Sequence, residues 1–149
     1  MFDDIYNQKI LELAANIPRL GRLPAPQASA SAHSRLCGSS ITIDLSLADG
    51  RVSDYAQDVK ACALGQAASS VMGRHIVGAA PAELRALRET MRKMLKESGP
   101  PPQGRFADAG VLEPARDYKA RHASILLVFD AVAEALDTIE QPDAAATHQ

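Results

Sequence analysis

Asp58-Val59-Lys60-Ala61-Cys62-Ala63-Leu64-Gly65-Gln66-Ala67-Ala68-Ser69-Ser70 is the stretch of the 149-residue chain on which the fold depends. The pattern is typical of a strand that ends and turns directly into a helix. A cysteine at such a junction lies beside unpaired backbone N–H groups and the positive end of the helix dipole, which stabilise negative charge on its sulfur. Cys62 is therefore placed for chemistry, and Cys37, the other cysteine of the chain, begins an earlier predicted strand.

A hairpin precedes this junction. Residues 41–47 alternate apolar and polar side chains without a fault, which predicts a strand with one buried side and one polar side that faces solvent. Asp49-Gly50 predicts the turn, because a tight hairpin needs positive φ angles that Gly adopts freely and Asp tolerates. The return strand is expected over 51–59, with a bulge soon after Val52 where the apolar positions change phase.

A hairpin returns the chain to the edge where it began, so Cys37 and Cys62 are predicted to be neighbours. Helices are expected over 3–17, with Asp3 or Asp4 as the N-cap, and over 62–77. Two more helices are expected, one from Pro81 to the loop at 99–104 and one from Pro114 onward. The charged residues of 85–96 are interpreted as a solvated face rather than as a basic docking surface.

The Pro-, Ala- and Ser-rich residues 18–35 are expected to form a flexible arm, and the polar residues 142–149 a frayed tail. Length and pattern together predict a single α+β domain over residues 1–149. It would contain a small antiparallel sheet of about three strands, packed on one face by helices.

Composition excludes several classes of function. A net charge of −2 and a pI near 6.1 provide no basic footprint for nucleic acid. The N-terminus lacks the pattern of a signal peptide, and no apolar run approaches the length of a membrane span. We therefore expect a cytoplasmic protein that binds neither nucleic acid nor membrane. In that compartment two cysteines serve as thiols, metal ligands or redox groups rather than as a structural disulfide.

His122, in the first turns of the last predicted helix, is the third residue that could converge on the two cysteines. Two thiolates and an imidazole suit zinc or iron–sulfur chemistry, with a fourth position left open. The residues alone leave this ligand set open against inert buried thiols and a histidine with satisfied hydrogen bonds. His33 on the arm is a further candidate ligand.

Several motifs occur in a suggestive order: Asp4-Ile5-Tyr6, Asn16-Ile17-Pro18-Arg19, Cys37-Gly38, the hairpin of 41–59, and Cys62-Ala63 followed by Ala67-Ala68-Ser69-Ser70. Over roughly residues 3–136 the chain resembles the NifU-like (IscU/SufU) iron–sulfur cluster assembly scaffold family. Residues 79–112 resemble the insertion of the longer, SufU-like branch. The resemblance implies sulfur transfer from a cysteine desulfurase, binding of a zinc ion or a nascent Fe–S cluster, and delivery to recipient apo-proteins.

Two departures from the family pattern stand out. Ser39 occupies the position of the family's aspartate. Around the family's third cysteine, the favoured register places His122 at the cysteine position, whereas an alternative register places Ala123 there and keeps His122 as the adjacent histidine. In both registers the third thiolate is absent. The resemblance thus predicts a site of Cys37, Cys62 and His122, with Cys62 as the persulfide acceptor.

Three functions are consistent with these residues. The favoured one is an iron–sulfur assembly scaffold or sulfur acceptor, which is not an enzyme. The second is a non-catalytic adaptor of the assembly machinery with a degenerate site. The third is a thiol transferase that uses a Cys62–His122 thiolate–imidazolium pair, although no orienting carboxylate or local signature accompanies that pair.

Overall fold

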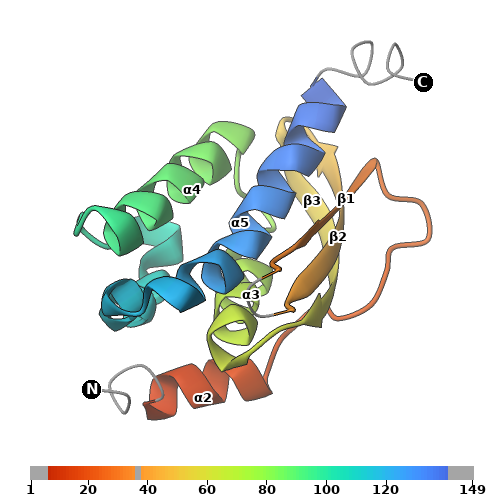
Figure 1. Ribbon diagram of the computed structural model, residues 1–149. Helices are drawn as coiled ribbons and strands as arrows, with labels where there is room; N and C mark the ends of the chain where they lie inside the picture. Colours follow the sequence, from red (N-terminus) through yellow and green to blue (C-terminus); the bar gives the residue numbers. More distant parts are fainter. Residues whose placement is uncertain (1–6, 36–37, 141–149) are drawn as a thin grey trace.

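The computed structural model of the chain describes residues 7–35 and 38–140 (Figure 1). In chain order the elements are α2 (Gln8–Ala15), β1 (Ala28–His33), β2 (Ser40–Ala48), β3 (Arg51–Lys60), α3 (Ala63–His75), α4 (Pro81–Lys96), the 3₁₀ segment η1 (Gly104–Asp117) and α5 (Lys119–Glu140). The strands form one antiparallel sheet in the order β1-β2-β3. Helix α5 packs on β1 and β2, and α3 packs on β3, α5 and α2 (Figure 1). This arrangement confirms the predicted α+β fold.

The hairpin forms as the sequence predicts. Asp49 and Gly50 both have positive φ, at 54° and 76°, as a tight turn between right-twisted strands requires. The pairing register shifts between Ser46 and Leu47, because β3 contains an extra residue, Ser53, at that point. The shift is the bulge predicted from the change of phase, and it restores the alternation that buries one face of both strands.

The arm of 18–35 was expected to be irregular and flexible; the expected irregularity is wrong, and the flexibility stays a prediction. Its second half forms β1, which pairs with β2 along its whole length. Its first half lies along the opposite edge of the sheet, where Gly21 N donates to Gln57 O (2.8 Å) and Gln57 N donates to Arg19 O (3.0 Å). The sequence of β1 alternates Ala with Ser, and its small side chains give a weak apolar signal although Ala28 and Ala30 are buried.

Asp44 departs from the predicted alternation of β2. Its carboxylate was expected to face solvent, yet its side chain is fully buried beneath the arm. It accepts hydrogen bonds from Arg22 Nε (2.7 Å) and Nη2 (2.9 Å), Leu23 N (2.9 Å) and Ser29 Oγ (2.5 Å). The hydrogen bonds from Arg22, aided by those from Ser29 and Leu23, lower the pKa of Asp44 against the opposing effect of burial. These four residues are called the Asp44 cluster below.

The first described helix, α2, begins at Gln8. Asn7 caps it, because its side-chain oxygen accepts a hydrogen bond from Ile10 N at 3.0 Å. The predicted caps Asp3 and Asp4 lie outside the described residues, as does the tail of 142–149. In the described part of the chain, no helix combines the length and the apolar composition that a bilayer span demands.

The C-terminal helix starts later than predicted. Pro114 does not open it but lies inside η1, and α5 begins at Lys119. The reason is that η1 uses short 3₁₀ turns, in which a proline without an N–H is tolerated more easily than inside an α-helix. The beginning of α4 at Pro81 agrees with the prediction.

Two arginines of α4 contact acidic residues of α5 as well as solvent. Arg85 pairs with Asp137 (2.5 Å) and Glu140 (2.9 Å), and Arg88 pairs with Asp130 (2.7 Å). These contacts connect α4 to the acidic side of α5. Arg85 and Arg88 are therefore paired within the protein, and the interpretation of this face as solvated rather than as a docking surface stays a prediction.

Candidate functional site

Cys62 lies at the junction between β3 and α3, as the sequence predicts. It is the N-cap residue of α3, with extended backbone angles (φ −68°, ψ 172°), and its carbonyl accepts the first helical hydrogen bond from Gln66 N (2.9 Å). Its side chain makes no capping hydrogen bond and is partly exposed. The thiol is thus held at a fixed point of the fold and remains accessible to a reagent or a partner.

Two serine hydroxyls form a row that leads from the Cys62 thiol into the protein interior. Cys62 Sγ lies 3.4 Å from Ser124 Oγ, and Ser124 Oγ lies 3.0 Å from Ser39 Oγ. Both serines are 2% exposed. One row of polar atoms therefore joins three segments that are distant in the sequence: the start of α3, the first turns of α5 and the entry to β2. These three residues are called the Cys62 cluster below.

Gly65 is the residue that lets α5 approach the Cys62 cluster. A Cβ atom built on Gly65 would lie 2.5 Å from Ser124 Oγ and 2.8 Å from Ala61 Cβ, both closer than real Cβ contacts. Sequence reasoning did not single out Gly65 or Ser124. The available signal was a glycine inside a helical pattern, which costs about 1 kcal/mol relative to alanine and so indicates a packing requirement.

His122 does not contact Cys62 in this structure. Its ring is 3% exposed, and its Nε2 lies 3.1 Å from Ala115 O and 3.0 Å from Arg116 O. Because both neighbours are acceptors, Nε2 carries the proton and donates. Residues two positions apart in a helix point about 200° apart around its axis, so the side chain of His122 faces away from the side on which Ser124 meets Cys62.

The three predicted ligands are therefore not assembled from the described residues. Cys37 lies outside them, although Ser39, two positions later in the sequence, belongs to the Cys62 cluster. His33 ends β1 with an exposed side chain. Within 7–35 and 38–140, no three His, Cys, Asp or Glu side chains group closely enough to hold a metal ion.

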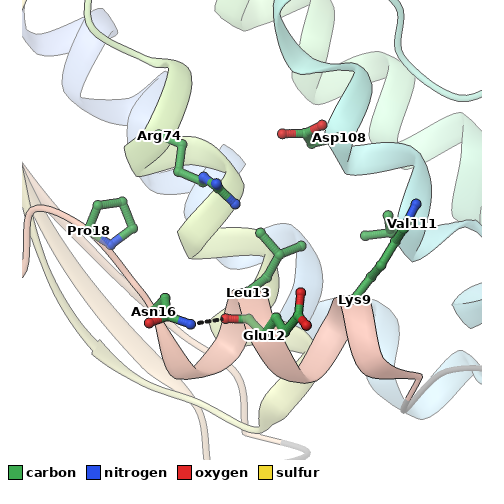
Figure 2. Close-up of a pocket in the computed structure, with 8 residues that line it drawn as sticks. All are labelled: Lys9, Glu12, Leu13, Asn16, Pro18, Arg74, Asp108 and Val111. Atoms are coloured by element: carbon green, nitrogen blue, oxygen red, sulfur yellow. Dashed lines mark hydrogen bonds between the residues drawn. The ribbon is translucent and has the colours of Figure 1, made fainter.

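A pocket of about 520 Å³ lies away from the Cys62 cluster, between α2, α3 and η1 (Figure 2). Basic, acidic and apolar side chains line this pocket together with one amide: Lys9, Glu12, Leu13, Asn16, Pro18, Arg74, Asp108 and Val111. Asp108 is already bound by His75 Nε2 at 2.8 Å. With two basic and two acidic side chains in its wall, this pocket favours no single class of charged ligand.

Comparisons with known proteins agree with this fold and junction. Residues 5–124 match the family model described as the NifU-like N terminal domain, and the chain belongs to that family. The crystal structure of a nitrogen-fixing NifU-like protein (N-terminal) from Brucella abortus is 59% identical, with a TM-score of 0.92, over 94% of this chain and 97% of that one. The resemblance inferred from the motifs is thus confirmed at the level of the family.

Two further relatives are more distant. The iron–sulfur cluster assembly scaffold protein IscU of Thermotoga maritima is 27% identical over 142 residues, which cover 95% of this chain and 99% of that protein. A putative iron–sulfur cluster assembly scaffold protein for the SUF system from Fervidobacterium islandicum shares the fold, with a TM-score of 0.82 at 18% identity over 90% of this chain and 98% of that one. The assignment to the SufU-like branch stays a prediction.

Proposed function

We propose that this protein is an iron–sulfur cluster assembly scaffold or sulfur acceptor whose reactive atom is Cys62 Sγ. The observation that carries the proposal is the position of that sulfur at the N-cap of a helix, partly exposed and in contact with a buried hydroxyl. Membership of the NifU-like family and the similarity to a protein named as the scaffold IscU support the same function.

Sulfur transfer to Cys62 requires no oxidant or reductant. The Cys62 thiolate attacks the terminal sulfur of a persulfide carried by a cysteine desulfurase. A new S–S bond forms to Cys62, the old S–S bond breaks, and the desulfurase cysteine leaves as a thiolate while the terminal sulfur keeps its proton. The hydroxyl of Ser124 is placed to donate a hydrogen bond to the attacking sulfur, because the two atoms are 3.4 Å apart.

The cargo would be a zinc ion or a nascent Fe–S cluster held by Cys62 and Cys37. Two thiolates are soft donors of the kind that both cargoes take, whereas the serine hydroxyls of the Cys62 cluster are not. The described residues supply only part of such a ligand set. The Nε2–H of His122 donates to two carbonyl oxygens, which leaves Nδ1 as its ligating atom. Because its side chain faces away from the side of α5 on which Ser124 meets Cys62, we place His122 outside the resting site.

In this proposal the chain acts as one cytoplasmic domain and as a scaffold rather than as an enzyme. Its partners would be a cysteine desulfurase, which supplies the sulfur, and apo-proteins, which receive the cluster. One observation favours a second function, that of an adaptor without cargo. Ser39, with a hydroxyl in place of a carboxylate, stands at the position of the family's aspartate.

The decisive experiment combines persulfide detection with metal analysis. The full chain is incubated with its cognate cysteine desulfurase and cysteine, and persulfide is located by mass spectrometry in the wild type and in the Cys62→Ser, Cys37→Ser and His122→Ala variants. Sulfur acceptance predicts persulfide on Cys62 that survives in the last two variants. Zinc and iron are then quantified in the same four proteins.

The outcomes separate the two functions. Loss of bound metal in both cysteine variants supports a scaffold that carries cargo. Absence of persulfide and metal from the wild type, together with undiminished binding of the desulfurase to Cys62→Ser, would leave only the adaptor. A loss of metal in His122→Ala with intact folding would restore His122 to the ligand set.

A further inference from the structure

The side of α5 that carries His122 borders a cavity of about 370 Å³ between the end of α4, the end of η1 and the start of α5. Its polar lining consists of Lys96, Ser98, Arg116, Asp117, Lys119 and His122. A concave volume of this size is within the range of small-ligand sites. Because it lies on the side of α5 opposite to Ser124, it is separate from the Cys62 cluster.

The charge of this cavity is strongly unbalanced. Three basic side chains line it, against one carboxylate, that of Asp117. Unlike the arginines of α4, Lys96 and Lys119 form no ion pair with any residue of 7–35 or 38–140. Arg116 is paired with Glu113 at 2.9 Å, yet its Nε is buried without a hydrogen-bond partner in the described structure. An anion would offset this excess of positive charge.

The geometry around the cavity favours an anion with several acceptor oxygens. Lys119 is the first residue of the 22-residue helix α5, so the cavity lies at the positive end of a long helix dipole. Ser98 has a positive φ of 54°, which turns the chain after α4 and brings a hydroxyl donor into the lining. Donor groups from the end of α4, the end of η1 and the start of α5 line one hollow, so an anion with several acceptor oxygens can accept hydrogen bonds from more than one of them.

We propose that this cavity binds a phosphate-class oxyanion, either free or carried by a nucleotide, through Lys96, Lys119 and Ser98. The ring of His122, fixed by the carbonyls of Ala115 and Arg116, forms its buried wall. The proposal is independent of cargo at Cys62. An acidic protein segment suits the site less well, because the basic groups surround a hollow rather than a flat surface.

The test uses isothermal titration calorimetry on the full chain at constant ionic strength. Inorganic phosphate and ATP are titrated separately, with chloride as the reference anion, into the wild type and the Lys96→Gln/Lys119→Gln variant. The matched control is Lys60→Gln/Lys93→Gln, which removes the same charge from exposed positions that do not line the cavity. Circular dichroism confirms that each variant is folded.

The expected result is saturable phosphate binding that weakens by about tenfold in the cavity variant and by less than about twofold in the control, since charge-assisted hydrogen bonds are lost only in the former. Tighter binding of ATP with competition by phosphate identifies a nucleotide-borne phosphate, and equal binding identifies the free anion. Absence of binding of both phosphate and ATP, or equal weakening of binding in both variants, would overturn the proposal. Cys62→Ser is expected to bind phosphate like the wild type.

Discussion

The Asp44 cluster and the Cys62 cluster both contain buried polar side chains, yet they differ in how completely these groups are paired. The Asp44 carboxylate receives four hydrogen bonds, two of them from a guanidinium. In the described part of the chain, the Cys62 thiol has one hydrogen-bond contact, to a hydroxyl at 3.4 Å. A fully paired charge stabilises one conformation, whereas a singly paired sulfur is left available for chemistry. The first cluster therefore serves the fold, and the second is suited to a reaction.

The largest effect on stability is expected from Asp44→Ala. The substitution leaves Leu23 N and the side chains of Arg22 and Ser29 without their acceptor, and the free energy of unfolding should fall by about 2–4 kcal/mol. Urea denaturation measures the change. The control Asp54→Ala loses a contact to Arg19 at 3.8 Å and a hydrogen bond from Tyr55 N at 2.9 Å, and because its carboxylate is 57% exposed it should cost only about 1 kcal/mol. Equal losses in the two variants would remove the distinction between a structural and an incidental carboxylate.

Gly65→Ala tests whether close packing creates the Cys62 cluster. The added methyl group would overlap Ser124 Oγ and Ala61 Cβ, so a loss of about 1–3 kcal/mol is expected. Adding Ser124→Ala should recover part of that loss, because one of the two overlaps disappears. Gly110→Ala is the control, since its new methyl would meet only Pro101 Cβ at 3.3 Å. A loss that Ser124→Ala does not reduce would contradict the role assigned to Gly65.

Acid should weaken the Asp44 cluster before it affects the Cys62 cluster. Hydrogen bonds from Arg22 hold the pKa of Asp44 in the folded protein below its unfolded value, which is about 4. The stabilisation is therefore complete above that unfolded value and is lost as the pH falls through the lower, folded value. Melting temperatures measured from neutral to acidic pH should decline less steeply at the acidic end for Asp44→Asn than for the wild type. Parallel curves would show that other carboxylates dominate.

Ser124→Ala is expected to change reactivity more than stability. Within the described residues, the Ser124 hydroxyl is the hydrogen-bond neighbour that can donate to the Cys62 sulfur. A net hydrogen bond of about 1 kcal/mol corresponds to a roughly fivefold slower alkylation of Cys62 by iodoacetamide. The Cys37→Ser background isolates Cys62. Ser31→Ala, which removes an exposed hydroxyl bonded to Thr42, is the control and should leave the rate unchanged. An unaltered rate in Ser124→Ala would assign the contact to packing alone.

The sequence predicted those parts of the fold that rest on strong local signals. The strand at 41–47, the Asp49-Gly50 turn and the Cys62 junction each rest on a strong local signal, and all three occur in the structure. Strand β1 was missed because alternating Ala and Ser contribute little apolar contrast. The burial of Asp44 was missed because its partner, Arg22, lies 22 positions away and only the folded sheet brings them together.

The site was less predictable than the fold for a geometric reason. Aligning a motif places His122 and Ser124 in the same short stretch, but only the rotation of α5 decides which of them faces Cys62. That rotation depends on how α5 packs against α3, where Gly65 leaves no room for a side chain next to Ser124. A pattern of residue types carries no information on this angle, so the sequence could identify the helix of the third partner without identifying the residue.

Because the arm is attached along the edge of β3, its detachment from the sheet can be followed by proteolysis. Arg19 and Arg22 are potential trypsin sites with exposed side chains, but the backbone around them is engaged by Gln57 and Asp44. A protease needs several residues in an extended, detached form before it can cut. The rate of trypsin cleavage at these arginines would therefore measure how often the arm detaches from the sheet, even while the rest of the domain stays folded.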